Sequence, residues 1–146
     1  MIEFLKHESE LPYNPNDKSS IIEYAQKLTQ KSLRNTCSEE ADSLKNNKGA
    51  FGQLVENLYF FIKTNNSPEP DFSSVGMELK TGGLNKKNSQ WRAKESMMLS
   101  SINYHNIIKE KFSKSSVINK SGCLLFIFYE YKKSILPLDL IIKVVG

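Results

Sequence analysis

Apolar side chains recur with helical spacing in the N-terminal half of this 146-residue chain. The first stripe opens with a capping box, Ser20-Ile21-Ile22-Glu23, and predicts a helix from Ser20 to about Leu33. After a polar break, a second helix is predicted near Gly49 to Thr64. Its apolar stripe consists of Phe51, Leu54, Val55, Leu58, Phe61 and Ile62.

Shorter apolar segments, which suit strands better than helices, dominate the second half of the chain. Val75 to Lys80 indicates the start of a strand, and the polar residues Gly82 to Ser89 predict a flexible loop after it. Met97 to Asn103 is expected to be a strand, with a helix as the alternative. Gly122 to Tyr131 contains a continuous apolar run, typical of a strand in a sheet covered on both faces. Leu138 to Val145 is the last predicted strand.

Two helices followed by four strands predict an α/β fold of the mixed α+β kind, with a central mixed β-sheet flanked by helices. The chain is long enough to bury one core, so residues 1–146 are expected to form a single domain. Its formal net charge of +4 and pI near 9.0 give a modest bias toward polyanionic partners.

The two cysteines and the lack of an apolar N-terminal segment indicate the cellular compartment of the protein. Cys37 and Cys123 lie far apart without metal-site spacing, and are expected to be reduced thiols in a cytoplasmic protein. No apolar run follows Met1, and no stretch approaches the length of a membrane span. Neither a signal peptide nor a membrane association is therefore expected.

Two carboxylates and one ammonium group, those of Asp71, Glu78 and Lys80, lie within ten residues. Residues two apart in a strand point to the same face, so Glu78 and Lys80 should project together. The loop just upstream can bring Asp71 beside Glu78. Hard carboxylate oxygens next to an ammonium group suit a divalent cation, an activated water and a phosphate. The pattern is that of a metal-dependent phosphodiesterase.

The same three residues allow a second interpretation. An Asp followed by Glu-x-Lys at loose spacing also occurs as a solvated strand face with a cross-paired lysine. The chain would then be a non-enzymatic, basic α/β module that binds DNA or another protein. Metal dependence separates the two interpretations, because a binding module should hold its partner equally well in EDTA.

Three stretches of the sequence support the interpretation of Asp71, Glu78 and Lys80 as a catalytic group. The first, Lys48 to Glu56, places a Lys-Gly pair at the start of a helix, with a Gly and a Glu further along. The second, Pro70 to Thr81, contains Asp-Phe and then Gly-Met-Glu-Leu-Lys-Thr. The third is Lys120 ahead of the apolar strand that ends Phe128-Tyr129-Glu130-Tyr131. Together they resemble the MutH and Sau3AI-type endonucleases of the PD-(D/E)xK nuclease superfamily, which implies a restriction-endonuclease-like core.

The resemblance implies a role for each residue of the second stretch. Asp71 and Glu78 would be ligands of Mg²⁺, for which Mn²⁺ substitutes, and the Leu79 main-chain carbonyl would supply a third ligand. Lys80 would orient or help to deprotonate the attacking water, or offset charge on the phosphate. A lysine beside two carboxylates normally stays protonated, which favours the electrostatic role.

Two further catalytic residues are implied in the same way. Glu56 would reach the metal site from the second helix, although on sequence alone it fits a solvated helix position. Lys120 would be a second active-site lysine, but its register is open because it lies in the turn before the buried strand.

A third group of candidates consists of basic residues near the catalytic strand. Lys86, Lys87, Arg92 and Lys94 could contact DNA phosphates, with a solvated loop as the alternative. Trp91 is expected to pack in the core or a loop rather than to stack on bases.

The resemblance implies a Mg²⁺-dependent endonuclease that cleaves double-stranded DNA at a short specific site, leaving 5′-phosphate and 3′-hydroxyl ends. It would belong to the type II restriction or the mismatch-repair nicking class. GATC is the expected site, because the named relatives recognise it. The family module continues beyond the strand that ends here at Gly146, so the chain is expected to be a catalytic fragment whose C-terminal recognition region is missing.

Overall fold

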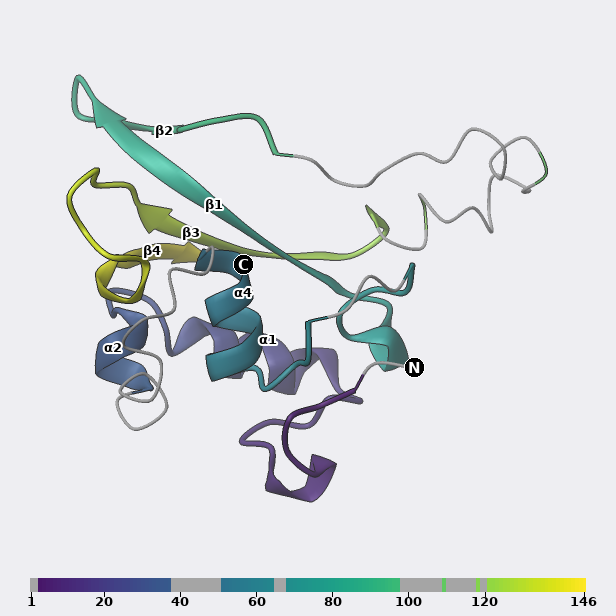
Figure 1. Cartoon of the computed structure of the whole chain (residues 1–146). Helices are drawn as coiled ribbons and strands as arrows, with labels where there is room; N and C mark the ends of the chain where they lie inside the picture. The colour runs from purple at the N-terminus through teal and green to yellow at the C-terminus, as the bar shows by residue number, and fades with distance from the viewer. Residues whose placement is uncertain (1–2, 38–50, 65–67, 98–108, 110–117, 119–120) are drawn as a thin grey trace.

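A mixed four-stranded sheet forms the centre of the computed structural model (Figure 1). The structure describes residues 3–37, 51–64, 68–97, 109, 118 and 121–146. The strands lie in the order β2-β1-β3-β4 and are β1 (Glu78–Lys87), β2 (Gln90–Ala93), β3 (Leu124–Glu130) and β4 (Ile142–Val145). β1 and β3 are parallel, whereas β2 and β4 pair antiparallel with their neighbours.

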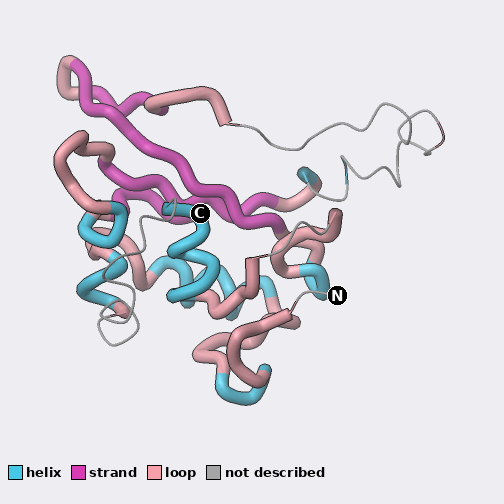
Figure 2. Tube along the Cα trace, viewed as in Figure 1, coloured by secondary structure: helices cyan, strands magenta, loops and turns pink. Residues whose placement is uncertain are grey.

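The helices of the described chain lie on one side of this sheet (Figures 1 and 2). They are α1 (Lys18–Gln26), α2 (Leu33–Thr36) and α4 (Phe51–Leu54), and α4 continues directly into one π-helical segment, Val55–Tyr59. The predicted class, an α/β fold with a mixed sheet and flanking helices, is confirmed.

The N-cap of the first helix lies three residues earlier than Ser20, the cap that the capping box predicted. Asp17 is the N-cap, and its carboxylate accepts a hydrogen bond from the Ser19 amide at 3.0 Å. The Ser20 hydroxyl instead accepts from the Asn14 amide at 2.9 Å, so it fixes the preceding loop. An aspartate cap satisfies the free amides of the first turn as well as a serine does, and the local sequence offers both.

The first helix also ends early, at Gln26 rather than near Leu33. The chain turns away because its backbone pairs with the last strand. The Gln30 amide donates to the Ile142 carbonyl at 2.8 Å, and the Ile142 amide donates to the Lys31 carbonyl at 2.9 Å. Gln30 takes a positive φ of 63° at this turn. A contact more than one hundred residues away in sequence therefore overrides the local helical pattern.

The predicted flexible loop Gly82–Ser89 is wrong. β1 continues through it to Lys87 and forms a hairpin with β2, in which Leu84 pairs with Ala93 and Lys87 with Gln90. The two-residue turn consists of Asn88 and Ser89, both with positive φ (50° and 63°), as a type I′ hairpin turn requires. The polar composition of this segment reflects the exposure of the hairpin and not a lack of structure.

The other strand predictions hold in part. β3 lies inside the predicted range of residues 122–131, but β4 begins only at Ile142 because Pro137–Asp139 forms a 3-10 turn. Of the strand predicted from Met97 to Asn103, only Met97 lies within the described residues, and it is not in a strand.

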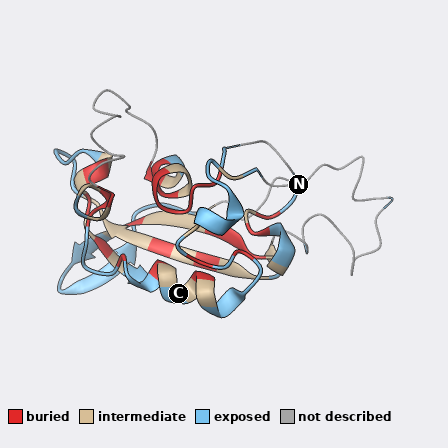
Figure 3. Cartoon of the chain, turned by 90° about the horizontal axis from the view of Figure 1, so that it is seen from below, coloured by how far each residue is buried: buried red, intermediate tan, exposed pale blue. Residues whose placement is uncertain are grey.

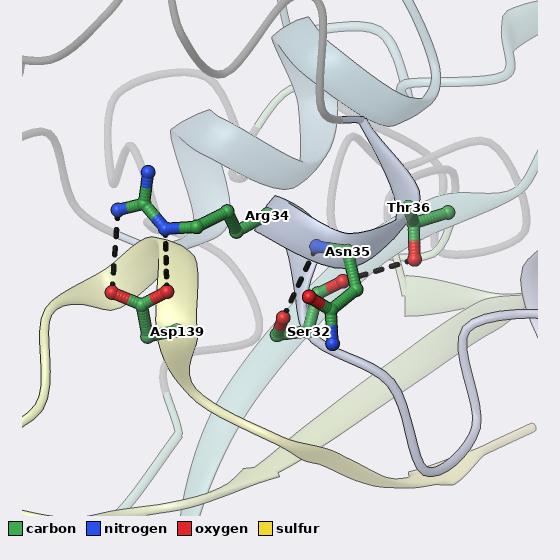
Figure 4. A network of polar contacts seen from close by, with 5 residues as sticks. All are labelled: Ser32, Arg34, Asn35, Thr36 and Asp139. Atoms are coloured by element: carbon green, nitrogen blue, oxygen red, sulfur yellow. Dashed lines mark hydrogen bonds and ion pairs between the residues drawn. The ribbon is translucent and has the colours of Figure 1, made fainter.

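A short polar network holds this 3-10 turn against α2 (Figure 4). Arg34 donates through Nε and Nη2 to the two carboxylate oxygens of Asp139 at 2.6 and 3.2 Å. Ser32 caps α2 through its hydroxyl and accepts from the Thr36 hydroxyl through its carbonyl. The two-point Arg34–Asp139 pair fixes the approach of the chain to β4.

The hydrophobic core lies between the sheet and the helices (Figure 3). Along β3, Leu125 and Ile127 are fully buried, whereas Phe126 and Phe128 on the opposite face are half-buried and stack at 5.5 Å. The strand was predicted to be covered on both faces. In the part of the chain that the structure describes, the helices bury only one of them.

Candidate active site

A tight turn brings Asp71 beside the start of β1. The Phe72 amide donates to the Met77 carbonyl at 2.9 Å and the Met77 amide to the Phe72 carbonyl at 3.2 Å, which closes the segment between them. Both side chains are almost completely buried, so they anchor the turn in the core. Gly76 takes φ 63° in this turn, a left-handed conformation that favours glycine. The turn fixes Asp71 opposite Glu78.

Hydrogen bonds join Asp71 to the strand. Asp71 Oδ2 accepts from the Leu79 amide at 2.9 Å, and the Asp71 amide donates to Glu78 Oε2 at 3.3 Å. The Glu78 amide donates in the opposite direction, to the Cys123 carbonyl just before β3. The Leu79 amide and carbonyl therefore point to the edge of β1 that faces away from β3, because the N–H and C=O of one strand residue point the same way. β2 pairs with this edge only further along, from Leu84 to Lys87. Asp71 occupies this edge.

Lys80 and Glu78 share one face of β1, as their spacing predicts. Lys80 Nζ lies 2.9 Å from Glu78 Oε1. Glu78 is 5% exposed, which is rare for a carboxylate that is not paired, and the Lys80 side chain is 21% exposed. The pair places a shielded negative charge and a less shielded positive charge next to Asp71.

Glu56 approaches these residues from the helical layer. It lies in the π-helical turn after α4, where the Phe60 amide donates to the Val55 carbonyl and the Ile62 amide to the Glu56 carbonyl. Phe61 has a positive φ of 56° where this turn ends. π-helical turns are rare and frequent at functional sites. The widened turn replaces the regular helix that was predicted to continue to Thr64.

The environment of Glu56 raises its pKa from 4.5 to about 7. Burial is the largest cause, the negative charges of Asp71 and Glu78 add to it, and Lys80 opposes it. The charges of all three residues thus act on Glu56, whereas direct hydrogen bonds join only Asp71, Glu78 and Lys80 among the predicted catalytic residues that the structure describes.

A close contact explains how the helix reaches the strand. A Cβ atom on Gly52 would lie 2.9 Å from Thr81 Oγ1, so only glycine lets α4 approach β1 this closely. Glu56 follows Gly52 by four residues, which is about one helical turn. The Gly and the Glu noted in the sequence motif thus have linked roles in the geometry.

The remaining predicted residues divide into two groups. Lys120 lies outside the described residues. Lys86, Lys87 and Arg92 lie in the exposed β1–β2 hairpin and Lys94 directly follows it, far along β1 from the carboxylates. Trp91 does not pack in the core, since it is 42% exposed on the edge strand β2.

A comparison with known protein families matches residues 60–145, more than half of the chain, to the family described as "DNA mismatch repair enzyme MutH". The chain belongs to the MutH family. The resemblance noted in the sequence is confirmed. The match spans Asp71, Glu78, Lys80 and all four strands, whereas Glu56 and α4 precede it.

A second comparison relates this MutH-family chain to the type II restriction enzyme Sau3AI of Staphylococcus aureus, with 36% identity over 93 residues. The aligned part covers 63% of this chain and 19% of Sau3AI, so it spans about a fifth of that relative. Within the described residues, no helix is both long and apolar enough to cross a membrane.

The candidate site offers the carboxylates of Asp71 and Glu78 to a divalent cation. Among the described residues, no three His, Cys, Asp or Glu side chains are grouped closely enough to hold a metal by themselves. Mg²⁺ does not need such a group, because it binds through one or two carboxylates and keeps several waters. Each carboxylate oxygen can accept more than one bond, so the contacts of Asp71 and Glu78 leave capacity for a ligand. The donor set fits a hard cation.

Proposed function

We propose that this chain is the catalytic part of a divalent-metal-dependent endonuclease that hydrolyses phosphodiester bonds of double-stranded DNA. The convergence of Asp71, Glu78 and Lys80 at the N-terminal end of β1 is the observation that carries the proposal. Membership of the MutH family and the similarity to Sau3AI support it. We propose that residues 1–146 form a single catalytic domain.

Asp71, Glu78 and the Leu79 carbonyl would hold the cation, which we propose to be Mg²⁺, with Mn²⁺ as a substitute. The bound cation would supply Lewis acidity for the phosphate and a more acidic water. Two hard carboxylate oxygens and one carbonyl oxygen suit Mg²⁺ better than soft metals.

Lys80 would stabilise the charge that develops on the scissile phosphate. Its ammonium group is fixed by Glu78 at 2.9 Å, so little reorganisation is needed when negative charge builds up. A fixed donor of this kind favours the electrostatic role over that of a general base.

Glu56 would hold or accept a proton at the site, because a pKa of about 7 lets it exist in both forms near neutral pH. Lys120 would be a second lysine at the scissile phosphate, as the family resemblance implies. Lys86, Lys87, Arg92 and Lys94 would add sequence-independent attraction for the duplex.

For the reaction as a whole, we propose in-line attack by water that leaves 5′-phosphate and 3′-hydroxyl ends. The enzyme would belong to the type II restriction class or to the mismatch-repair nicking class, and it would recognise GATC. Membership of the MutH mismatch-repair family and the similarity to the type II restriction enzyme Sau3AI support this class.

Incubation of the chain with a GATC-containing duplex and a scrambled duplex, in Mg²⁺ and in EDTA, tests the proposal. Cleavage in Mg²⁺ and none in EDTA is expected. The competing function, a basic module that only binds, predicts intact DNA in both conditions and equal binding with and without metal.

A further inference from the structure

Trp91, on the exposed β1–β2 hairpin, lies close to two lysines. In the β1–β2 register it pairs directly with Lys86, whose Nζ lies 5.6 Å from the indole ring centroid. Lys143 Nζ, from β4, lies 6.0 Å from the same centroid. These distances fall within cation–π range. The ring is 42% exposed, so a partner can reach it.

Glu130 completes the group and holds one of the lysines in place. Its carboxylate lies 3.5 Å from Lys143 Nζ and 3.8 Å from Lys132 Nζ. Lys143 also donates to Gln30 Oε1 at 3.4 Å. We define Lys86, Trp91, Glu130 and Lys143 as the Trp91 patch, to which each of the four strands contributes one residue.

Strand alternation places the Trp91 patch on the same face of β1 as the candidate active site. Glu78, Lys80 and Lys86 are separated by even numbers of residues along one strand without a register shift, so their side chains share a face. Six residues separate Lys80 from Lys86, which corresponds to about 20 Å along the strand.

The other basic residues of the hairpin point the opposite way. Lys87 and the cross-strand pair Asn85–Arg92 alternate with Lys86 and Trp91, and therefore lie on the other face. Lys94 lies over the Tyr131 ring at 4.1 Å and near Glu95 at 3.8 Å, so its ammonium group already has partners. The basic residues thus do not form one continuous patch.

We propose that the Trp91 patch binds the sugar–phosphate backbone of duplex DNA, about 20 Å from the scissile phosphate. This inference rests on the proposed endonuclease function. Lys86 and Lys143 would contact phosphates, and the indole would pack against a deoxyribose with its N–H directed to a phosphate oxygen. At roughly 3.4 Å per base pair, the contact lies about six base pairs from the cut. The patch positions the duplex and carries no base specificity.

The composition of the chain makes the proposal directly testable, because Trp91 is its only tryptophan. Intrinsic tryptophan fluorescence therefore reports on the patch alone. A labelled duplex gives an independent measure of binding by anisotropy. Both are recorded with the whole chain in EDTA, so that the duplex stays intact.

Lys86→Ala and Lys18→Ala form a matched pair, since each removes the same charge from an exposed lysine. Lys86 belongs to the Trp91 patch on β1, whereas Lys18 lies on α1, in the helical layer on the opposite side of the sheet. DNA should shift or quench the Trp91 emission in the native chain. Lys86→Ala should weaken binding about fivefold and lower the slope of log K against log salt by about one, whereas Lys18→Ala should change both much less. Trp91→Ala should also weaken binding, and Trp91→Phe should restore much of it.

Two outcomes would overturn the inference. If the duplex binds but the emission is unchanged and the two lysine variants behave alike, the Trp91 patch is not a DNA contact, while the proposed function stands. If the labelled duplex does not bind at all, the proposed function itself fails. Circular dichroism of each variant confirms that the fold is intact.

Discussion

Burial and neighbouring carboxylates disfavour the negative charge of Glu56 in the folded protein. Its pKa is about 7 in the folded protein because of burial and the nearby Asp71 and Glu78 charges, against an ordinary value of 4.5. At a pH between these two pKa values, Glu56 holds a proton in the folded protein that it has released in the unfolded chain. The free energy of unfolding therefore falls as pH rises through this window, and Glu56 contributes no further change above it.

Glu56→Gln should remove this loss of stability. In EDTA, the variant should gain about 1–3 kcal/mol over the native chain near pH 8 and show little difference near pH 4, because the native Glu56 is then protonated. Urea unfolding at both pH values measures the effect. The exposed Glu23 on α1 provides the control through Glu23→Gln. A gain that is equal at the two pH values would show that the Glu56 charge does not cause it.

Lys80→Ala should abolish cleavage, since it removes the fixed positive charge at the scissile phosphate. On sequence alone this substitution would affect stability little, but the structure bonds Lys80 to a Glu78 that is almost buried. The loss should therefore lower the unfolding free energy by about 1–3 kcal/mol.

Lys80→Gln separates the two effects, because an amide can still donate to Glu78 without supplying charge. It should recover most of the stability in urea unfolding and none of the cleavage. Substantial cleavage by either variant would end the catalytic assignment of Lys80.

At the scale of elements, the contact between α4 and β1 sets the distance from Glu56 to the carboxylates. Alanine in a helix interior is normally favoured over glycine by about 1 kcal/mol. At position 52, however, the Cβ of an alanine would lie only 2.9 Å from Thr81 Oγ1, which is too close. Thr81 is β-branched, and its restricted χ1 leaves little room to adjust.

Gly52→Ala should therefore destabilise the fold by about 1–2 kcal/mol and reduce cleavage, despite its better helix propensity. Thr81→Ala removes the obstructing hydroxyl, so the double variant should be more stable than the sum of the two single changes predicts. Thermal unfolding of the native chain, the two single variants and the double variant gives the coupling energy between positions 52 and 81. Strict additivity would mean that the Gly52–Thr81 contact does not fix the helix.

The sequence predicted the elements that carry strong local patterns. The Glu78–Lys80 spacing placed both side chains on one strand face, and the apolar run before Tyr129 identified β3. Asp71 was expected near Glu78, but the paired backbone of Phe72 and Met77 that holds it there leaves no periodic signal.

Other features depend on contacts between distant residues. α1 ends at Gln26 because Gln30 and Lys31 bond to Ile142, which no local pattern indicates. The β1–β2 hairpin looked like a loop because both its faces are polar, and its turn is Asn-Ser rather than the more recognisable Asn-Gly. The π-helical turn at Glu56 also has no sequence signature.

At the scale of the whole molecule, the sheet separates two surfaces. The helices pack on one face, and Glu78 and Lys80 of the candidate active site share the other face of β1 with the Trp91 patch. Glu56 approaches the site from the helical layer. A duplex that contacts both the site and the Trp91 patch would lie along β1. Under the proposed function, the fold would thus provide the reacting groups at one end of a strand and basic groups for the DNA backbone at the other.

We propose that Asp71, Glu78 and Lys80 form a metal-dependent cleavage centre. Single-turnover cleavage of a GATC-containing duplex in Mg²⁺ should be compared for the native chain, Asp71→Asn and Glu78→Gln, with Asp17→Asn as the control at the α1 cap. The native chain and the control should cleave the duplex in Mg²⁺ and not in EDTA, and the two site variants should lose at least about a hundredfold in rate. Cleavage that persists in Asp71→Asn, or in EDTA, would show that these residues are not a metal-dependent cleavage centre.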